Sequence, residues 1–198
     1  MRRMRIIITG FTAFTIYVVF TALAFSKYPN AYNPVNNWLS DLGNPLVNQS
    51  GALLYNLGCV LTSIVLIVFY LEMGEWGNDN KRLKVLLTIA RVAGIFSSIF
   101  LIITALFPLG SHTEIHQISG KVHVIFLGFF LTFSATVLLR NPVLTKWPAY
   151  FGFITAVVNF VYGAFLYSVF IAEWLAIGMF IIYLLMISFA SLQVKRIR

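Results

Sequence analysis

Charged residues are scarce in this sequence, and their scarcity excludes a water-soluble domain. Asp, Glu, Lys and Arg make up 10% of the 198 residues, while 60% are hydrophobic and the mean hydropathy is +0.88. Soluble domains contain about 25% charged residues. No polar stretch is long enough to form a second domain outside the membrane. The sequence therefore predicts one membrane-embedded domain over residues 1–198.

Cysteine, acidic residues and histidine are rare as well. Cys59 is the only cysteine, so the chain has neither an internal disulfide nor a thiolate cluster for a metal ion. There are six acidic residues and three histidines. Any chemistry that needs a carboxylate or an imidazole must therefore use very few side chains.

Long apolar runs fill the sequence instead. A transmembrane helix needs about 20 apolar residues to cross a hydrocarbon core of about 30 Å. The runs lie at about residues 6–26, 51–72, 87–108, 118–139, 149–168 and 174–193. They predict an all-α, polytopic protein of the cell membrane, with six transmembrane helices in one bundle.

The net charge of +8 follows this topology. Lys27 and Lys121 lie on one predicted side of the membrane, and the other basic residues lie at or near the opposite side. These are Arg2, Arg3, Arg5, Lys81, Arg82, Lys84, Arg91, Arg140, Lys146, Lys195, Arg196 and Arg198. Because cytoplasmic loops carry an excess of Lys and Arg, both termini are predicted to be cytoplasmic. The charge is thereby explained, and we expect no nucleic-acid partner.

The first loop on the opposite, outer side, residues 27–51, is predicted to contain a short amphipathic helix at the membrane interface. Asn33 and Pro34 are typical of a helix start, and Gly43 is typical of a stop. Apolar residues recur with helical spacing at Val35, Trp38, Leu39 and Leu42. Asp41 falls near the end of this helix, where the helix dipole disfavours a carboxylate by about 0.3–1 kcal/mol. Either solvent tolerates that cost, or a cation, a donor or a histidine lies nearby.

All three histidines fall on one face of the fourth predicted helix. His112, His116 and His123 lie within about 40° of one another on a helical wheel of 100° per residue, and Ser119 joins them. Ser111 and Glu114 match the S-x-x-E capping box, which predicts that this helix begins in the aqueous layer. The stripe therefore runs from the outer water into the membrane.

Two chemistries fit this stripe. His112 and His116 are spaced i, i+4, as in sites where two imidazoles bind one metal ion. We predict that Asp41 binds zinc together with His112, His116 or His123, since one ion does not easily reach all three histidines of a straight helix, and that Asp41, Ser40 and His116 are catalytic. In a metal-free alternative, a histidine paired with Asp41 is the general base. Further predicted pocket residues are Asn37, Asn56, Glu114, Ser119, Asn159, Tyr162 and Glu173, although helix–helix hydrogen bonding is the default explanation for buried amides.

Three segments carry a family resemblance: WLSDLG at 38–43, SGALLYNLG at 50–58, and LFPLG at 106–110 followed by histidine. They resemble a prokaryotic family of six-helix membrane proteins of unknown function. More distantly, the chain is similar to membrane proteins related to the damage-regulated autophagy modulator and to a Golgi factor in GPI-anchor lipid remodelling, which implies a role with lipids. The alkaline ceramidases and the progestin and adiponectin receptors use similar residue types around zinc, but their order differs.

Three classes of function follow from these features. The first is a hydrolase or binder of lipid headgroups, metal-dependent or not, with membrane lipids as partners. The second is a non-enzymatic scaffold, pH sensor or accessory subunit. The third is a transporter or haem protein, which is disfavoured because few polar residues lie near the membrane midplane and the histidines share one helix.

Overall fold

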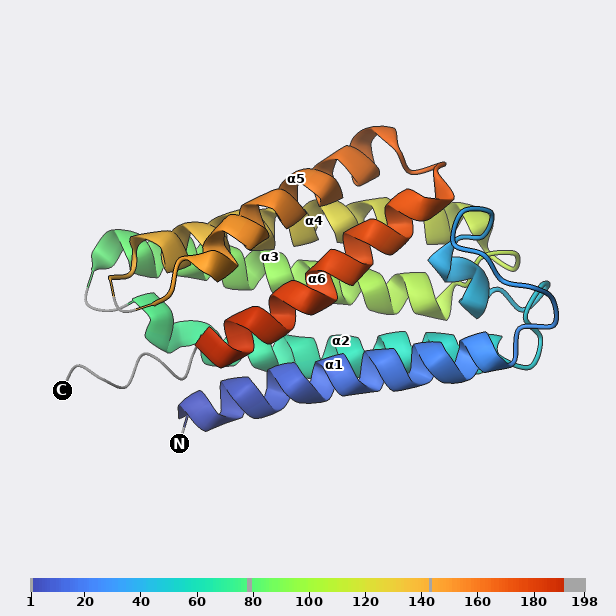
Figure 1. Cartoon of the computed structure of the whole chain (residues 1–198), viewed down its shortest axis with the longest axis horizontal. Coiled ribbons are helices and arrows are strands. Elements are labelled where there is room, and N and C mark those ends of the chain that lie inside the picture. The colour runs from blue at the N-terminus through green and yellow to red at the C-terminus, as the bar shows by residue number, and fades with distance from the viewer. Residues whose placement is uncertain (1, 78–79, 143, 191–198) are drawn as a thin grey trace.

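The computed structural model describes residues 2–77, 80–142 and 144–190, and all regular secondary structure in these ranges is helical (Figure 1). The long helices are α1 (Arg2–Ser26), α2 (Ala52–Glu72), α3 (Lys81–Leu106), α4 (Thr113–Arg140), α5 (Trp147–Phe165) and α6 (Phe170–Ala190). Two short 3-10 helices, η1 (Leu39–Gly43) and η2 (Met73–Gly77), follow α1 and α2.

All six long helices are long and apolar enough to cross a membrane. The predicted all-α membrane architecture is therefore confirmed. Helices α3 and α4 begin before the predicted apolar runs, at Lys81 instead of residue 87 and at Thr113 instead of residue 118, and for α4 the capping-box pattern had predicted a start in the aqueous layer. Helical hydrogen bonding starts in the polar segment, which hydropathy alone does not reveal. Residues 191–193, which were predicted to end the last helix, lie outside the described residues.

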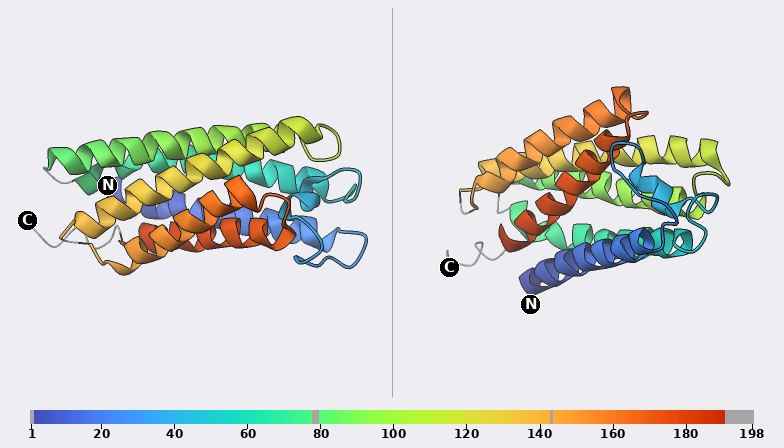
Figure 2. Two further views of the ribbon diagram at one scale, coloured as in Figure 1. Left: turned by 90° about the horizontal axis from the view of Figure 1, so that it is seen from above. Right: turned by 45° about the vertical axis from the view of Figure 1, so that its right-hand side comes forward.

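The six helices form a closed ring in chain order (Figures 1 and 2). Each long helix contacts the next one along the chain, and α6 contacts α1 to complete the ring. The connections from α1 to α2, α3 to α4 and α5 to α6 lie at one end, together with η1 (Figure 1). We term this the η1 end, and the opposite end, where α1 begins, the basic end.

The distribution of basic residues agrees with the sequence prediction. The described helices begin or end at the basic end with Arg2, Arg3, Arg5, Lys81, Arg82, Lys84, Arg140 and Lys146. Arg91 reaches the end of α2, where its Nε and Nη2 atoms donate hydrogen bonds of 2.9 Å to the carbonyls of Tyr70 and Leu71. Lys195, Arg196 and Arg198 lie outside the described residues. That the basic end faces the cytoplasm stays a prediction from the positive-inside rule.

Aromatic side chains fill the ring toward the basic end. The ring of Tyr70 lies over Gly94, where a Cβ atom would come within 2.8 Å of it, and contacts Phe130 at 4.7 Å between centroids. Tyr183 lies over Gly152 in the same way. Small residues let transmembrane helices approach closely. The rings of these two tyrosines therefore fill the space over the two glycines.

The first loop does contain a short helix, but it is shorter than the predicted amphipathic helix and of the 3-10 type. Residues 34–36 form a turn, and only Leu39–Gly43 is helical, as the 3-10 helix η1. Asn33 does accept a hydrogen bond from the backbone of Val35 at 2.9 Å, but this closes only the turn. Side chains from elsewhere bind the carbonyls of the loop, so these groups are not free for an α-helix.

Candidate functional site

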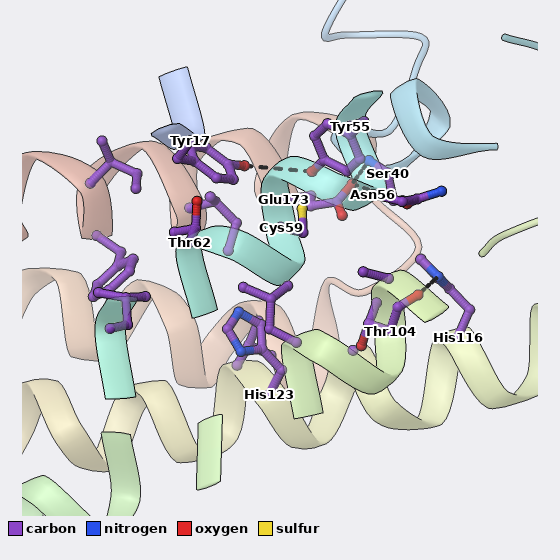
Figure 3. A pocket seen from close by; sticks show the side chains of 18 of the residues that line it. Tyr17, Ser40, Tyr55, Asn56, Cys59, Thr62, Thr104, His116, His123 and Glu173 are labelled. Carbon is purple, nitrogen blue, oxygen red and sulfur yellow. Dashed lines mark hydrogen bonds between the residues drawn. The ribbon is translucent and has the colours of Figure 1, made fainter. Parts of the chain in front are cut away.

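The half of the ring near η1 encloses a cavity of about 60 Å³ (Figure 3). All six long helices line it, as do Ser40 of η1 and Tyr167 of the loop between α5 and α6. The polar lining residues are Tyr17, Ser40, Tyr55, Asn56, Cys59, Thr62, Thr104, His116, His123, Tyr162, Tyr167 and Glu173. A polar cavity needs about 10–15 Å³ of such volume to hold one water molecule, so this space is large enough for a small polar group.

A wider hollow of about 410 Å³ adjoins the cavity at the η1 end. Ser40, His116, Tyr162 and Tyr167 line both spaces. The remaining residues of the wider hollow are partly polar and partly apolar, and include Trp38, Leu109, Gln117, Lys121, Phe165 and Ser168. We refer to this hollow as the mouth of the cavity.

η1 is held at this end by side chains that bind its backbone. Asn48 donates to the carbonyls of Leu42 (2.8 Å) and Ala24 (3.1 Å), and Asn56 donates to Gly43 (2.8 Å). Buried backbone carbonyls need such partners. The loop therefore takes a fixed conformation that presents Ser40 to the cavity.

Glu173, in the first turn of α6, supplies the only carboxyl group of the described cavity lining. Its Oε2 atom accepts hydrogen bonds from the backbone amide and the Oγ of Ser40, at 3.3 and 3.4 Å (Figure 3). No Lys or Arg is among the described residues that line the cavity. The carboxyl group is thus held by neutral donors, without a cation from the lining.

Both buried histidines bind α3 through one ring nitrogen. The Nδ1 of His116 donates to the carbonyls of Thr104 (3.1 Å) and Phe107 (3.2 Å), near the end of α3, where carbonyls lack helical partners. The Nδ1 of His123 donates to the carbonyl of Ser97 at 2.9 Å. Because a carbonyl only accepts, the proton of each ring lies on Nδ1. In the neutral ring, Nε2 is then a hydrogen-bond acceptor.

Four tyrosines complete the polar lining. The hydroxyls of Tyr17 and Tyr55 lie 3.5 Å apart (Figure 3), and the rings of Tyr162 and Tyr167 stack with centroids 5.2 Å apart. Burial, with the Glu173 carboxyl nearby, raises the pKa of Tyr167 well above its ordinary value. Its hydroxyl therefore keeps its proton and stays neutral.

The predicted pairing of Asp41 with His116 does not occur. Asp41 lies in η1, outside the lining of both hollows, and its Oδ2 accepts a hydrogen bond of 3.0 Å from the backbone of Trp38. It therefore caps η1. Burial raises its pKa above the ordinary carboxyl value. The 3-10 turn brings Ser40, rather than Asp41, to the cavity.

The predicted zinc ligands are not assembled either. Among the described residues, no group of three or more His, Cys, Asp or Glu side chains is placed to hold a metal ion. His112 precedes the first turn of α4, and its ring contacts Phe107 at the η1 end. His116 turns its Nδ1 toward α3, and Asp41 caps η1. Histidine, aspartate and zinc therefore do not fit together here, and the likeness to the zinc-dependent ceramidases finds no support.

The remaining predicted pocket residues divide into two groups. Asn56, Tyr162 and Glu173 line the cavity. The residues outside the lining of both hollows are Asn37, Glu114, Ser119 and Asn159. Ser119 donates to the carbonyl of Ile115 (2.6 Å), and Asn159 donates to Thr155 (2.9 Å) and Ala176 (3.3 Å). These side chains satisfy backbone groups within and between helices.

Sequence reasoning missed several lining residues: Tyr17, Thr62, Thr104 and Tyr167. One signal was present in α2, where Tyr55, Cys59 and Thr62 follow one another at i, i+4 and i+7. This spacing puts them on one helical face. Tyr167 lies in a loop, and no periodicity identifies it.

The six-helix ring and its polar cavity can now be compared with known proteins. Residues 11–192 match a family described as a protein of unknown function, DUF998. The chain belongs to the DUF998 family. The match spans every residue that lines the cavity and its mouth. The predicted membership of a membrane protein family of unknown function is thus confirmed.

No curated protein and no solved structure matches the chain. The expected distant similarity to relatives of the autophagy modulator and to the Golgi lipid-remodelling factor is therefore unsupported. Membership of the DUF998 family assigns no activity, so any function must be argued from the cavity itself.

Proposed function

We propose that this DUF998 protein binds the polar head of a membrane lipid, or of a related amphiphile, in the cavity of its six-helix ring. The observation that supports this most is the grouping of Glu173, His116 and His123 around one cavity between membrane-spanning helices. Ionisable side chains within membrane segments are costly, and they commonly mark binding sites or substrate pathways.

The composition of the mouth supports an amphiphilic ligand. Gln117, Lys121 and Ser168 give it polar groups, while Leu109 and Phe165 are apolar, and Phe165 is 80% exposed. An amphiphile can place its head in the polar cavity and leave its chain along the apolar surface. A purely water-soluble ligand would not use that surface.

Hydrolysis of the bound head is a second candidate, because Ser40 Oγ lies 3.4 Å from Glu173 Oε2. In this proposal Glu173 is the general base and Ser40 or a water molecule is the nucleophile. A product from a defined lipid, formed by the wild type and not by Glu173→Gln or Ser40→Ala, would establish it. Binding without turnover would leave the first candidate alone.

A scaffold or sensor does not require a polar cavity inside the ring. Burying polar groups without partners costs free energy. A protein that acts only as a scaffold has no need for buried polar side chains such as Glu173 and Thr62 at these positions. The Oγ1 of Thr62 is buried and has no hydrogen-bond partner. Other buried atoms without partners, such as Trp76 Nε1 and Asn159 Oδ1, lie outside the cavity lining, so the carboxyl of Glu173 inside the cavity favours ligand binding more than Thr62 does.

The single cysteine offers a direct test, because Cys59 lines the cavity. Small methanethiosulfonate reagents convert an accessible thiol to a mixed disulfide and release methanesulfinate. We expect them to modify Cys59 in the folded, full-length protein in detergent or nanodiscs, as read by intact mass. Lipids that bind in the cavity should slow this modification.

Two variants are controls for the test. Cys59→Ser must abolish the mass increase, which assigns it to this thiol. Ala105→Phe places a large ring in the cavity lining and should slow the modification. If neither a cationic nor an anionic reagent modifies folded wild-type protein, while the denatured protein reacts, the cavity is closed and the proposal is wrong.

A further inference from the structure

Besides its tyrosine and cysteine side chains, the ionisable groups that line the cavity are a carboxyl and two imidazoles, while its hydroxyl and amide groups can both donate and accept hydrogen bonds. When ionised, the carboxyl group of Glu173 only accepts hydrogen bonds, and among the described lining residues there is no Lys or Arg to donate to a ligand or to repel a cation. Lys121 is the one Lys or Arg among the described residues that line the mouth. The charge inside the cavity is therefore negative or zero.

The two histidines strengthen this bias. The Nδ1 atoms of both His116 and His123 donate to carbonyls at α3 or its C-terminal end, so the N–H group of each neutral ring is already hydrogen-bonded within the protein. The remaining ring nitrogen, Nε2, offers a lone pair in the neutral ring. Two imidazoles that line the cavity thus add acceptors to the carboxyl group.

Aromatic rings provide a second attraction for a cation. Tyr17, Tyr55, Tyr162 and Tyr167 all line the cavity. A positively charged nitrogen within about 6 Å of an aromatic ring centroid is attracted to the face of that ring. Lys121 already shows this at the mouth, where its Nζ lies 5.0 Å from the centroid of Tyr167.

We propose that the group bound in the cavity is an organic ammonium group, held by the carboxyl of Glu173, the histidine acceptors and the tyrosine rings. This inference rests on the proposed function and names the chemical class of its ligand. An ammonium group supplies what the described lining lacks, namely a positive charge opposite Glu173, together with donors for the acceptor atoms of the cavity.

The mouth adds a second element of recognition. Lys121 lies there, with Gln117 and Ser168 as neutral polar groups. A zwitterionic head such as phosphoethanolamine can place its amine in the cavity and its phosphate near Lys121. Its positive amine and negative phosphate then lie opposite the carboxyl of Glu173 in the cavity and the amine of Lys121 at the mouth, respectively.

The sharpest test compares two reagents of similar size and opposite charge at Cys59. These are 2-aminoethyl methanethiosulfonate, a cation, and 2-sulfonatoethyl methanethiosulfonate, an anion. The ratio of their rates, divided by the same ratio for free cysteine, cancels differences in intrinsic reactivity and in thiol ionisation. We expect this normalised ratio to be at least tenfold above one in the wild type, and to fall about tenfold in Glu173→Gln.

Matched variants separate charge from structure. Glu114→Gln removes an exposed carboxyl at the same end of the bundle and should leave the ratio unchanged. Glu173→Asp keeps the charge and should retain the preference for the cation, even if its shorter side chain lowers both rates. A normalised ratio near one in the wild type overturns the ammonium inference, although the open cavity of the proposed function then stands.

Protection experiments with lipids and with a free amine identify the source of the ammonium group. Short-chain phosphatidylethanolamine, phosphatidylglycerol with the same chains, and free ethanolamine are each tested for protection of Cys59. Protection by phosphatidylethanolamine alone supports a lipid headgroup, and equal protection by ethanolamine supports a soluble amine. Stronger protection by phosphatidylglycerol would refute the inference for either source.

Discussion

Replacing Glu173 by Gln should leave the fold at least as stable as the wild type, in contrast to most substitutions of a buried hydrogen-bonded residue. The amide keeps an acceptor oxygen for Ser40. The two hydrogen bonds, at 3.3 and 3.4 Å, are longer than the usual 2.7–3.2 Å range. Each is therefore worth no more than about 0.5 kcal/mol, the low end for such bonds.

The free energy regained by removing the buried charge of Glu173 is larger than the loss from weakening these two hydrogen bonds. An ionised carboxyl group removed from water costs several kcal/mol even after the surrounding structure relaxes, and no Lys or Arg of the described cavity lining offsets that cost. Glutamine removes it. For each 1 kcal/mol recovered, the melting temperature should rise by about 2–4 °C, the usual response of a chain of this size.

Thermal unfolding followed by far-ultraviolet circular dichroism in one detergent measures the change. Glu114→Gln serves as the control, because it removes an exposed first-turn carboxyl of α4 and should lower stability by at most about 1 kcal/mol. If Glu173→Gln instead lowers the melting temperature by more than about 4 °C, the carboxylate is a structural anchor for η1. That result would contradict the inference that the carboxyl of Glu173 destabilises the ligand-free protein and is present to bind a ligand.

Three further predictions concern the fold. Gly94→Ala should be about 1–3 kcal/mol less stable than Gly178→Ala in thermal unfolding. A Cβ atom at Gly94 meets the buried ring of Tyr70 at 2.8 Å, whereas one at Gly178 meets nothing within 4 Å. Equal stabilities of the two variants would contradict this packing. Burial raises the pKa of Asp41, so folding favours its protonated form, and the folded state loses stability as the pH rises past the ordinary carboxyl value. The stability of Asp41→Asn relative to the wild type should therefore increase from acidic to neutral pH. Melting curves at several pH values measure this, and a constant difference would contradict it. Arg91→Met should lower the melting temperature more than Arg82→Met, because only Arg91 donates to two carbonyls at the end of α2.

The transmembrane architecture was predictable from sequence because its cause is local. Each helix needs only a long apolar run, and its backbone hydrogen bonds are made within the same segment. The end of a run is less informative, as α4 shows: its first turn at Thr113 lies in a polar segment. Hydropathy identifies what crosses the hydrocarbon, while hydrogen bonding sets where a helix begins.

The site was predicted only in part, because tertiary contacts decide which polar groups share a cavity. Helical spacing correctly put His116 and His123 on one face, and both line the cavity. It did not reveal that Asp41 would cap η1, or that Glu173, far away in sequence, would meet Ser40. Those outcomes depend on how the loop folds over the ring, which has no periodic signal.

The side chains inside the ring explain why this cavity lies toward η1. Toward the basic end, Tyr70 and Tyr183 fill the space over Gly94 and Gly152. Toward η1, the corresponding space is bordered by shorter polar side chains such as Thr62 and Cys59. A hydroxyl without a partner and a carboxyl without a cation cost free energy in both halves alike. Buried polar atoms without partners occur in both halves, for example at Thr62 beside the cavity and at Glu72 and Trp76 toward the basic end. Only the groups beside the cavity border a space that a ligand can enter, so a ligand can supply the donors or charge that Glu173 and Thr62 lack.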